Sequence, residues 1–158
     1  METQDLNYIH SYLSFFLNNE NFAISVNSVL EIIELPVLTI VPNSPKFIEG
    51  VLNFRGEIVP VINMHKRFNK EPLADKQKMV IVINYETEEV KLHLGLLVNE
   101  VEGVVEFELK DIRNLPDMGL KYNPEFLQGM VEMKNMFIMI IDVHKVFEPS
   151  ELAKTEIN

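Results

Sequence analysis

The sequence contains no cysteine and no tryptophan, and it has only six glycines among 158 residues. Without cysteine the chain can form no disulfide, thiol nucleophile or cysteine metal site, and it suits a reducing compartment. The longest apolar run, Met136–Ile141, is too short to cross a bilayer. The first residues lack a basic region followed by an apolar core, which predicts no signal peptide. We therefore expect a soluble, cytoplasmic protein without direct membrane insertion.

Positive charge is also scarce. The formal net charge is −10, and no stretch of the sequence clusters lysine and arginine. A nucleic-acid partner is therefore not expected. The excess of carboxylates has a simpler interpretation, since it would keep a protein of this size soluble. With 47% apolar residues, the chain has enough material for a core.

What the chain does contain is an internal duplication. Residues 44–68 align without a gap with residues 123–147, at an offset of 79 positions, which is half the chain. Seven positions are identical in this alignment: Pro45/Pro124, Phe47/Phe126, Gly50/Gly129, Ile62/Ile141, His65/His144, Lys66/Lys145 and Phe68/Phe147. Upstream, residues 22–33 resemble residues 94–105 at an offset of 72. A repeat of this length predicts two copies of one supersecondary unit, with a seam between them where ligands tend to bind.

Short β-rich runs separated by turn residues indicate small barrels rather than a βαβ sheet. Tyr12–Leu17 and Phe22–Val26 flank a polar turn and predict a hairpin. Ser28–Ile33 predicts a helical turn leading into a strand, and the proline-bounded segment Leu35–Pro42 predicts an extended crossing. In the second half, strands are expected at Met79–Asn84, Val90–Val98 and Val104–Leu109.

The repeated unit itself predicts a helical turn, a hairpin and a second short helix. Ser44 as N-cap, Pro45 at the first position and Gly50 as a left-handed stop predict a one-turn helix at Pro45–Glu49. The second copy offers the corresponding Asn123, Pro124 and Gly129. Strands Val51–Phe54 and Ile58–Ile62 then form a hairpin, and Asn63 and Asp142 each cap a short helix. The polar segment Asn69–Lys78 reads as a linker, which divides the chain into subdomains 10–78 and 79–148 with tails 1–9 and 149–158.

No arrangement of side chains predicts catalysis, a metal site or a cofactor. The four histidines, His10, His65, His93 and His144, lie too far apart in sequence for a metal motif. His65 and His144 occupy equivalent repeat positions, so surface or capping roles are expected. No serine lies in a nucleophile motif, and neither glycine-rich phosphate-binding pattern occurs. The protein is therefore not expected to be an enzyme.

Three features could instead form a binding site. Arg55 stands beside a turn glycine between two apolar strands, although a solvated turn cation is an equally simple interpretation. Glu31 is a lone carboxylate in an apolar run, and burying it unpaired would cost several kcal/mol. Arg55 is its natural partner, because a planar guanidinium suits a carboxylate. The third feature is Leu96–Val101, whose side chains read mainly as core strand.

These residues resemble the CheW-type chemotaxis adaptors. The resemblance rests on Tyr12–Leu17, on Val29–Ile32 and on Pro42–Phe68, where the family pattern is a V-x-E-I segment followed by P-N-x-P-x-F-I-x-G-V-x-N-L-R-G. It continues weakly to about residue 148. The chain departs from the pattern at Phe54, Asn63, Met64 and His65, and the last of these loses a permanent positive charge.

The resemblance implies an all-β protein of two SH3-like five-stranded barrels related by a pseudo-two-fold, with short helices. It implies a non-enzymatic scaffold that couples the cytoplasmic tip of methyl-accepting chemoreceptors to the regulatory domain of the histidine kinase CheA. By residue-wise matching, a receptor helix would lie in an inter-barrel groove near Val29, Glu31, Arg55 and Val98. The kinase would bind at barrel ends that carry Gly50 and Gly129.

Other functions remain open at this point. A small-molecule-binding β-barrel sensor could use the same seam, and a closed pocket rather than an open trough would favour it. A cofactor-dependent barrel enzyme is disfavoured, because no phosphate-holding cluster is visible. An adaptor in a chemosensory system that controls an output other than flagella, such as pili, fits the sequence equally well.

Overall fold

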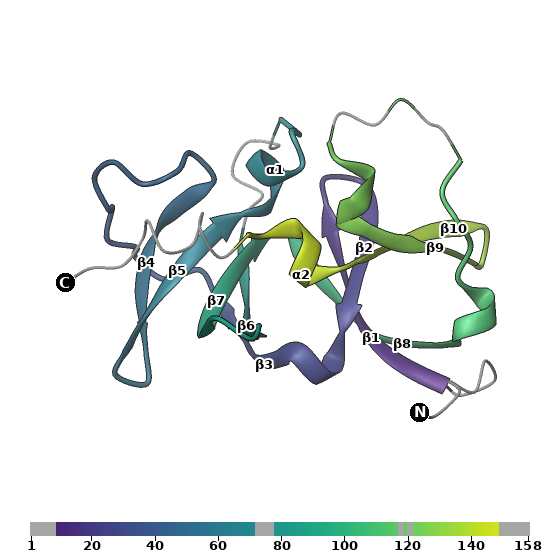
Figure 1. Cartoon of the computed structure of the whole chain (residues 1–158), viewed down its shortest axis with the longest axis horizontal. Helices are drawn as coiled ribbons and strands as arrows, with labels where there is room; N and C mark the ends of the chain where they lie inside the picture. Colours follow the sequence, from purple (N-terminus) through teal and green to yellow (C-terminus); the bar gives the residue numbers. More distant parts are fainter. Residues whose placement is uncertain (1–8, 72–77, 117–118, 120–121, 149–158) are drawn as a thin grey trace.

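The computed structural model describes residues 9–71, 78–116, 119 and 122–148. The two tails, most of the expected linker and part of the loop Pro116–Tyr122 lie outside the described residues. Ten strands form two five-stranded sheets (Figure 1). The strands are β1 (Ile9–Leu17), β2 (Glu20–Ser25), β3 (Val29–Glu34), β4 (Ile48–Phe54), β5 (Glu57–Asn63), β6 (Met79–Glu86), β7 (Lys91–Val98), β8 (Glu100–Glu108), β9 (Leu127–Met133) and β10 (Met136–Ile141).

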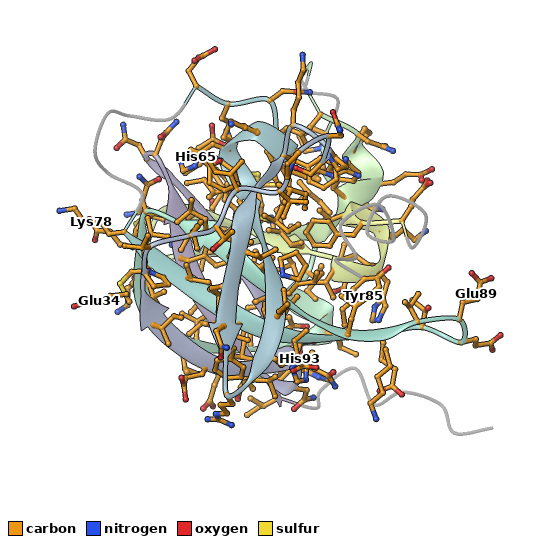
Figure 2. All side chains as sticks on the ribbon, turned by 90° about the vertical axis from the view of Figure 1, so that its left-hand side faces the viewer. Glu34, His65, Lys78, Tyr85, Glu89 and His93 are labelled. Atoms are coloured by element: carbon orange, nitrogen blue, oxygen red, sulfur yellow. The ribbon has the colours of Figure 1, made fainter. Side chains whose placement is uncertain are left out.

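Five short helical segments accompany the strands in the described part of the chain. They are η1 (Val26–Ser28), α1 (Met64–Arg67), η2 (Leu109–Asp111), η3 (Pro124–Phe126) and α2 (Val143–Val146). The all-β class and the strand positions expected from sequence are confirmed. The helical turn before β3 is confirmed as η1. Figure 2 shows that the β6–β7 hairpin projects from the body of the molecule with Glu89 at its tip.

The two sheets exchange strands between the halves of the sequence. One sheet has the order β8-β1-β2-β10-β9 and the other β3-β6-β7-β5-β4. The hairpin β1–β2 therefore lies beside strands of the second half, and its repeat counterpart β6–β7 lies beside strands of the first half. The exchange is reciprocal, as the duplication requires. The expected division at residues 78/79 consequently separates the two repeats in sequence but does not separate the two sheets.

Apolar side chains pack in one shared core and two smaller ones. The shared core takes residues from both sheets, among them Phe15, Phe22, Ile81 and Leu96, together with Phe68 and Phe147 after the short helices. The two smaller clusters are each confined to one sheet and the chain segment after its edge strand. Because the shared core fills the seam, the two sheets form one packed body. Burial of these side chains is the main contribution that holds the sheets together.

The two edge strands of each sheet are linked by one isolated bridge. Thr39, beyond β3, exchanges two backbone hydrogen bonds of 2.8 and 2.9 Å with Val51 of β4. Arg113, beyond β8, exchanges bonds of 2.8 and 2.9 Å with Met130 of β9. The crossing segment expected at Leu35–Pro42 supplies the first of these bridges. The strand pairing thus shows two five-stranded sheets with single edge-to-edge bridges, rather than continuous closed barrels.

Gly50 and Gly129 serve these bridges, so their expected role as left-handed helix stops is wrong. Both are buried within strands, and Gly50 has a φ of 159°, far from the left-handed helical region. A Cβ at Gly50 would lie 2.7 Å from the Thr39 carbonyl oxygen, and one at Gly129 would lie 2.6 Å from the Arg113 oxygen. Glycine is required because the bridging backbone passes so close.

The expected helices are confirmed in part. Asn63 and Asp142 cap α1 and α2, their side chains accepting from the Lys66 and His144 amides. The one-turn helix at Pro45–Glu49 is wrong, because β4 already begins at Ile48 and only a turn precedes it. Ser44 does not cap it either, since its hydroxyl donates to the Val41 carbonyl at 2.9 Å. In the second copy, Pro124–Phe126 does form a short 3-10 helix.

The expected surface role of His65 is also wrong. Its side chain is fully buried, and Nε2 lies 2.7 Å from Oδ1 of Asn99 (Figure 2). The same oxygen accepts from the Asn18 amide at 2.5 Å. Burial lowers the pKa of His65, and nearby Lys70 lowers it further while the bond to Asn99 opposes both. His65 thus joins three segments inside the molecule, whereas its counterpart His144 is exposed.

Candidate functional site

Arg55 lies at the tip of the β4–β5 hairpin, in a turn that the sequence specifies. Arg55 and Gly56 have φ values of 52° and 83°, as a type I′ hairpin turn requires. The Asn53 side chain supports the turn by accepting from the Gly56 amide at 2.9 Å. The repeat counterparts, Lys134 and Asn135, have φ values of 50° and 64°, so the second copy makes the same turn. This geometry presents the side chain of Arg55 beyond the sheet.

Glu31 and Arg55 form the pair expected from the sequence. Arg55 Nη2 donates to Glu31 Oε1 at 2.7 Å, and the guanidinium carbon lies 4.7 Å from the centre of the Phe54 ring. The Arg55 and Glu31 side chains are 69% and 40% exposed. An ion pair in so much solvent contributes about 0.2–1 kcal/mol at most. Its charges are therefore available to a partner with little loss of fold stability.

The pair has no equivalent in the second copy. The position that corresponds to Glu31 is Gly103, and the one that corresponds to Arg55 is Lys134. The pair also joins β3 to the β4–β5 tip, the two edges of one sheet. Exposed Leu30 and Ile32 alternate with Glu31 along β3, so they lie on the other face of this edge strand. The site is an ion pair on an edge strand with apolar side chains on its other face, which suits protein recognition better than chemistry.

The structure brings together three of the four residues expected to line the groove, but not Val98. Val29 and Glu31 lie on one strand, and Arg55 reaches Glu31. Val98 is fully buried at the end of β7, opposite Met79, whereas Val29 is opposite Ile83, four residues further along β6. The interpretation of Leu96–Val101 as core strand is confirmed for Leu96, Leu97 and Val98, which are buried. Val98 cannot contact a partner unless the shared core opens.

His93 adds a second polar contact near the hairpin. Its Nδ1 lies 2.6 Å from Oε2 of Glu57, the first residue of β5, and its ring meets Phe54 edge-on at 6.4 Å (Figure 2). Within the ranges that the structure describes, no three histidine, aspartate or glutamate side chains gather as a metal would need. His93 therefore reads as a support for the hairpin.

A basic cluster near α1 was missed in the sequence. Lys46, Lys66, Arg67 and Lys70 line one hollow beside the seam. Arg67 lies between the repeat-related rings Phe47 and Phe126, at 4.8 and 5.0 Å, and its Nε donates to the Val146 carbonyl at 2.7 Å. Three of the four cations lie within five residues of sequence, a signal too short to count as a basic run. The fourth comes from the loop before β4.

Two exchanged β-sheets with an exposed ion pair are consistent with a binding protein, and comparison with known proteins specifies its class. The family description "CheW-like domain" matches residues 11–151. The chain therefore belongs to the CheW family of chemotaxis coupling proteins, which act as scaffolds. The small-molecule sensor considered above finds no support in these similarities.

Relatives match over most of their length. The chain is 33% identical to the chemotaxis protein CheW of Thermotoga maritima over 138 residues, 86% of each chain. It is 31% identical to CheW of Klebsiella aerogenes, covering 90% of this chain and 84% of that one. Among solved structures, the scaffolding protein TtCheW of Thermoanaerobacter tengcongensis superimposes with a TM-score of 0.78, at 25% identity and 96% coverage of both chains. Within the described residues no helix is long and apolar enough to span a membrane.

Proposed function

We propose that this protein is a non-enzymatic cytoplasmic scaffold that couples the cytoplasmic tip of methyl-accepting chemoreceptors to the regulatory domain of the histidine kinase CheA. Family membership supports the scaffold role. The exposed Glu31–Arg55 pair is the observation that carries the proposed receptor contact. A scaffold of this kind changes kinase activity only by binding its conformational states unequally.

The receptor site comprises Val29 and Glu31 on β3 together with Arg55 at the β4–β5 tip, where the ion pair joins the two edges of the sheet. A receptor helix would lay its apolar side against Val29 and along the edge of β3, in a helix-in-groove mode. The ion pair would fix its orientation through polar contacts at the rim. Val98 is buried in the shared core and takes no direct part in this contact.

The kinase sites are the two sheet ends where Gly50 and Gly129 permit the edge bridges. Both glycines are buried, so they act by shaping the end of the sheet rather than by touching the kinase. We further propose that each sheet, with its bridging segment, is an SH3-like barrel, so that a kinase domain of similar fold could pack against it end to end. Repetition of such contacts in an array would add avidity.

The test of the receptor site is charge reversal at Arg55. Arg55→Glu is expected to weaken pull-down of the organism's own receptor fragment, while the urea midpoint stays within error because the pair is exposed. The matched control is Lys134→Glu, which reverses a charge in the same turn type on the other sheet. Unchanged receptor and kinase binding by the folded Arg55→Glu protein would remove this assignment.

A double reversal then asks whether the pair acts as a unit. Glu31→Arg combined with Arg55→Glu is expected to recover part of the binding that each single reversal loses. A double-mutant cycle measures this recovery directly. Strict additivity of the two losses would show that the contact between Glu31 and Arg55 is irrelevant to binding.

A further inference from the structure

Two hollows join beside α1 and the residues that follow it. α1 lies on the opposite side of the molecule from β3 (Figure 1). Each has a volume of about 980 Å³, and they share Asn69, Lys70, Glu71 and Tyr122 as lining residues. We call the joined hollows the seam cleft. Its lining comes from one sheet (β2, β9 and β10), from α1 and from loops of both halves of the sequence, and it does not include Glu31 or Arg55. The seam cleft is therefore separate from the proposed receptor site.

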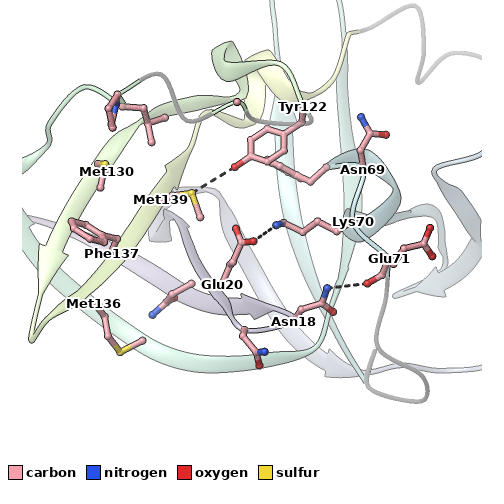
Figure 3. Close-up of a pocket in the computed structure, with 16 residues that line it drawn as sticks. Asn18, Glu20, Asn69, Lys70, Glu71, Tyr122, Met130, Met136, Phe137 and Met139 are labelled. Carbon is pink, nitrogen blue, oxygen red and sulfur yellow. Dashed lines mark hydrogen bonds and ion pairs between the residues drawn. The ribbon is translucent and has the colours of Figure 1, made fainter.

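One half of the seam cleft is apolar and rich in methionine. Met130, Met136, Phe137 and Met139, all on the β9–β10 hairpin, form its wall (Figure 3). Phe137 is 52% exposed and Met136 45% exposed. Unbranched, polarisable methionines adapt to different apolar partners, and such side chains are common at interaction surfaces. The first copy has Glu57 where the second has Met136, so this apolar wall belongs to one sheet only.

The other half of the seam cleft is basic. Lys46, Lys66, Arg67 and Lys70 supply four of the 14 lysines and arginines in a chain with a net charge of −10, and Glu71 is the single carboxylate among the described residues that line the same hollow. Lys66 meets Glu49 at 3.4 Å, but its side chain is 48% exposed, so solvent weakens this pair. Arg67 is fixed between its two rings. The positive charge is therefore local, and it is partly preorganised.

Lys70 forms the boundary between the two halves. It pairs with Glu20, and its ammonium lies 5.8 Å and 5.9 Å from the ring centres of Phe22 and Tyr122. Tyr122 donates to Met139 Sδ at 3.6 Å (Figure 3). Burial, together with the Glu20 charge, raises the pKa of Tyr122 to about 12, which keeps its hydroxyl protonated. Lys70 and Tyr122 are thus held in place by an ion pair, by ring contacts and by a hydrogen bond.

We propose that the seam cleft is a docking site for a partner-protein segment in which apolar side chains are followed by acidic ones. The apolar residues would cover Met136 and Phe137, removing two exposed large side chains from water. The acidic residues would lie over Lys46 and Lys66, where charge complementarity selects an anionic occupant. Because the cleft is separate from Glu31 and Arg55, a segment docked here leaves the proposed receptor site accessible.

The experiment selects peptides from a random phage-displayed library on the full-length protein and measures the binding of the winners by fluorescence anisotropy. Enriched sequences are expected to combine an apolar run with two or more acidic residues. The paired substitution Lys46→Glu/Lys66→Glu, and separately Met136→Glu, should each weaken binding by about tenfold or more, which corresponds to about 1.4 kcal/mol. Met136→Glu introduces the residue that the first copy already carries at this position.

The matched control is Lys91→Glu/Lys110→Glu, which makes the same change in net charge at exposed positions outside the cleft. It should leave peptide binding unchanged, and equal urea midpoints confirm that all variants fold. The proposal is overturned if no peptide is enriched, if enriched peptides lack acidic residues, or if the control weakens binding as much as the cleft variants. Binding of dodecyl phosphate without any enriched peptide would overturn it in favour of a lipid-like anion. None of these outcomes depends on receptor or kinase binding.

Discussion

Replacing Gly129 by alanine tests whether the edge bridges hold the sheets in shape. The new Cβ would lie 2.5 Å from Ile112 Cγ2 and 2.6 Å from the Arg113 carbonyl oxygen. Real Cβ contacts are not this short, so something must move. Either the bridge opens and loses its two hydrogen bonds, each worth about 0.5–1.5 kcal/mol, or the strand shifts at an overpacking cost of about 1–3 kcal/mol.

Both routes give a loss of about 1–3 kcal/mol. Alanine returns about 0.4–1 kcal/mol by restricting the unfolded chain, which leaves a net loss of about 1.3 kcal/mol at the middle of these ranges. This is a substantial part of a typical stability of about 5–15 kcal/mol. At a slope of about 2 kcal/mol per molar urea, the unfolding midpoint should fall by roughly 0.5–1 M. Gln128→Ala, an exposed neighbour on the same strand, is the control and should change little.

A second substitution identifies which contact is responsible. Ile112→Ala removes the clash with Cγ2 but leaves the Arg113 carbonyl in place. Gly129→Ala should therefore remain destabilising in the Ile112→Ala background. A loss below about 0.5 kcal/mol in the single variant would refute the reasoning, because surface substitutions fall in that range. Full recovery in the double variant would assign the effect to side-chain packing instead of the bridge.

Two further predictions concern the seam. Because burial lowers the pKa of His65 in the folded state, the unfolded chain binds more protons just below its pKa of about 6.5. The stability contribution of neutral His65 is therefore complete above about pH 6.5 and is lost as the pH falls toward the pKa of His65 in the folded protein. As the pH is lowered through this window, the urea midpoint should fall less steeply in His65→Gln than in the control His144→Gln. Arg67→Lys keeps the charge but loses the planar contact with Phe47 and Phe126 and the bond to the Val146 carbonyl, so it should cost about 1–2 kcal/mol in urea unfolding. Lys145→Arg, at an exposed position on α2, is its control and should be neutral.

The duplication and the ion pair were predictable because each depends on local pattern. The repeat places turn residues at fixed offsets, and Gly56 marked the turn between the two strands, although the positive φ of Arg55 was not predicted. Glu31 stood out because a charge in an apolar run needs solvent or a partner. The structure confirms the contact between Glu31 and Arg55 that these rules predicted.

The exchange of hairpins could not be predicted, because both arrangements satisfy the same strand patterns. In either arrangement β1 and β6 bury the same faces, and only the connection lengths differ. The burial of His65 was missed for a related reason. Its sequence neighbours are those of an exposed helical turn, whereas its partner Asn99 comes from the other half of the chain. The prediction of helix stops at Gly50 and Gly129 failed because glycine also serves close backbone approach, which depends on residues far away in sequence.

The duplication explains how one small chain can present different surfaces on equivalent frames. Core positions of the two copies carry similar residues, as at Ile62/Ile141 and Phe68/Phe147, because each packs in the shared core. Surface positions have diverged in charge and size, as at Glu31/Gly103 and Glu57/Met136. Arg67 shows the same divergence inside the seam, since it donates to the carbonyl of its own counterpart, Val146. Pseudo-symmetry therefore constrains the scaffold but not its contacts, and a protein built this way can bind unlike partners on its two sheets without a second fold.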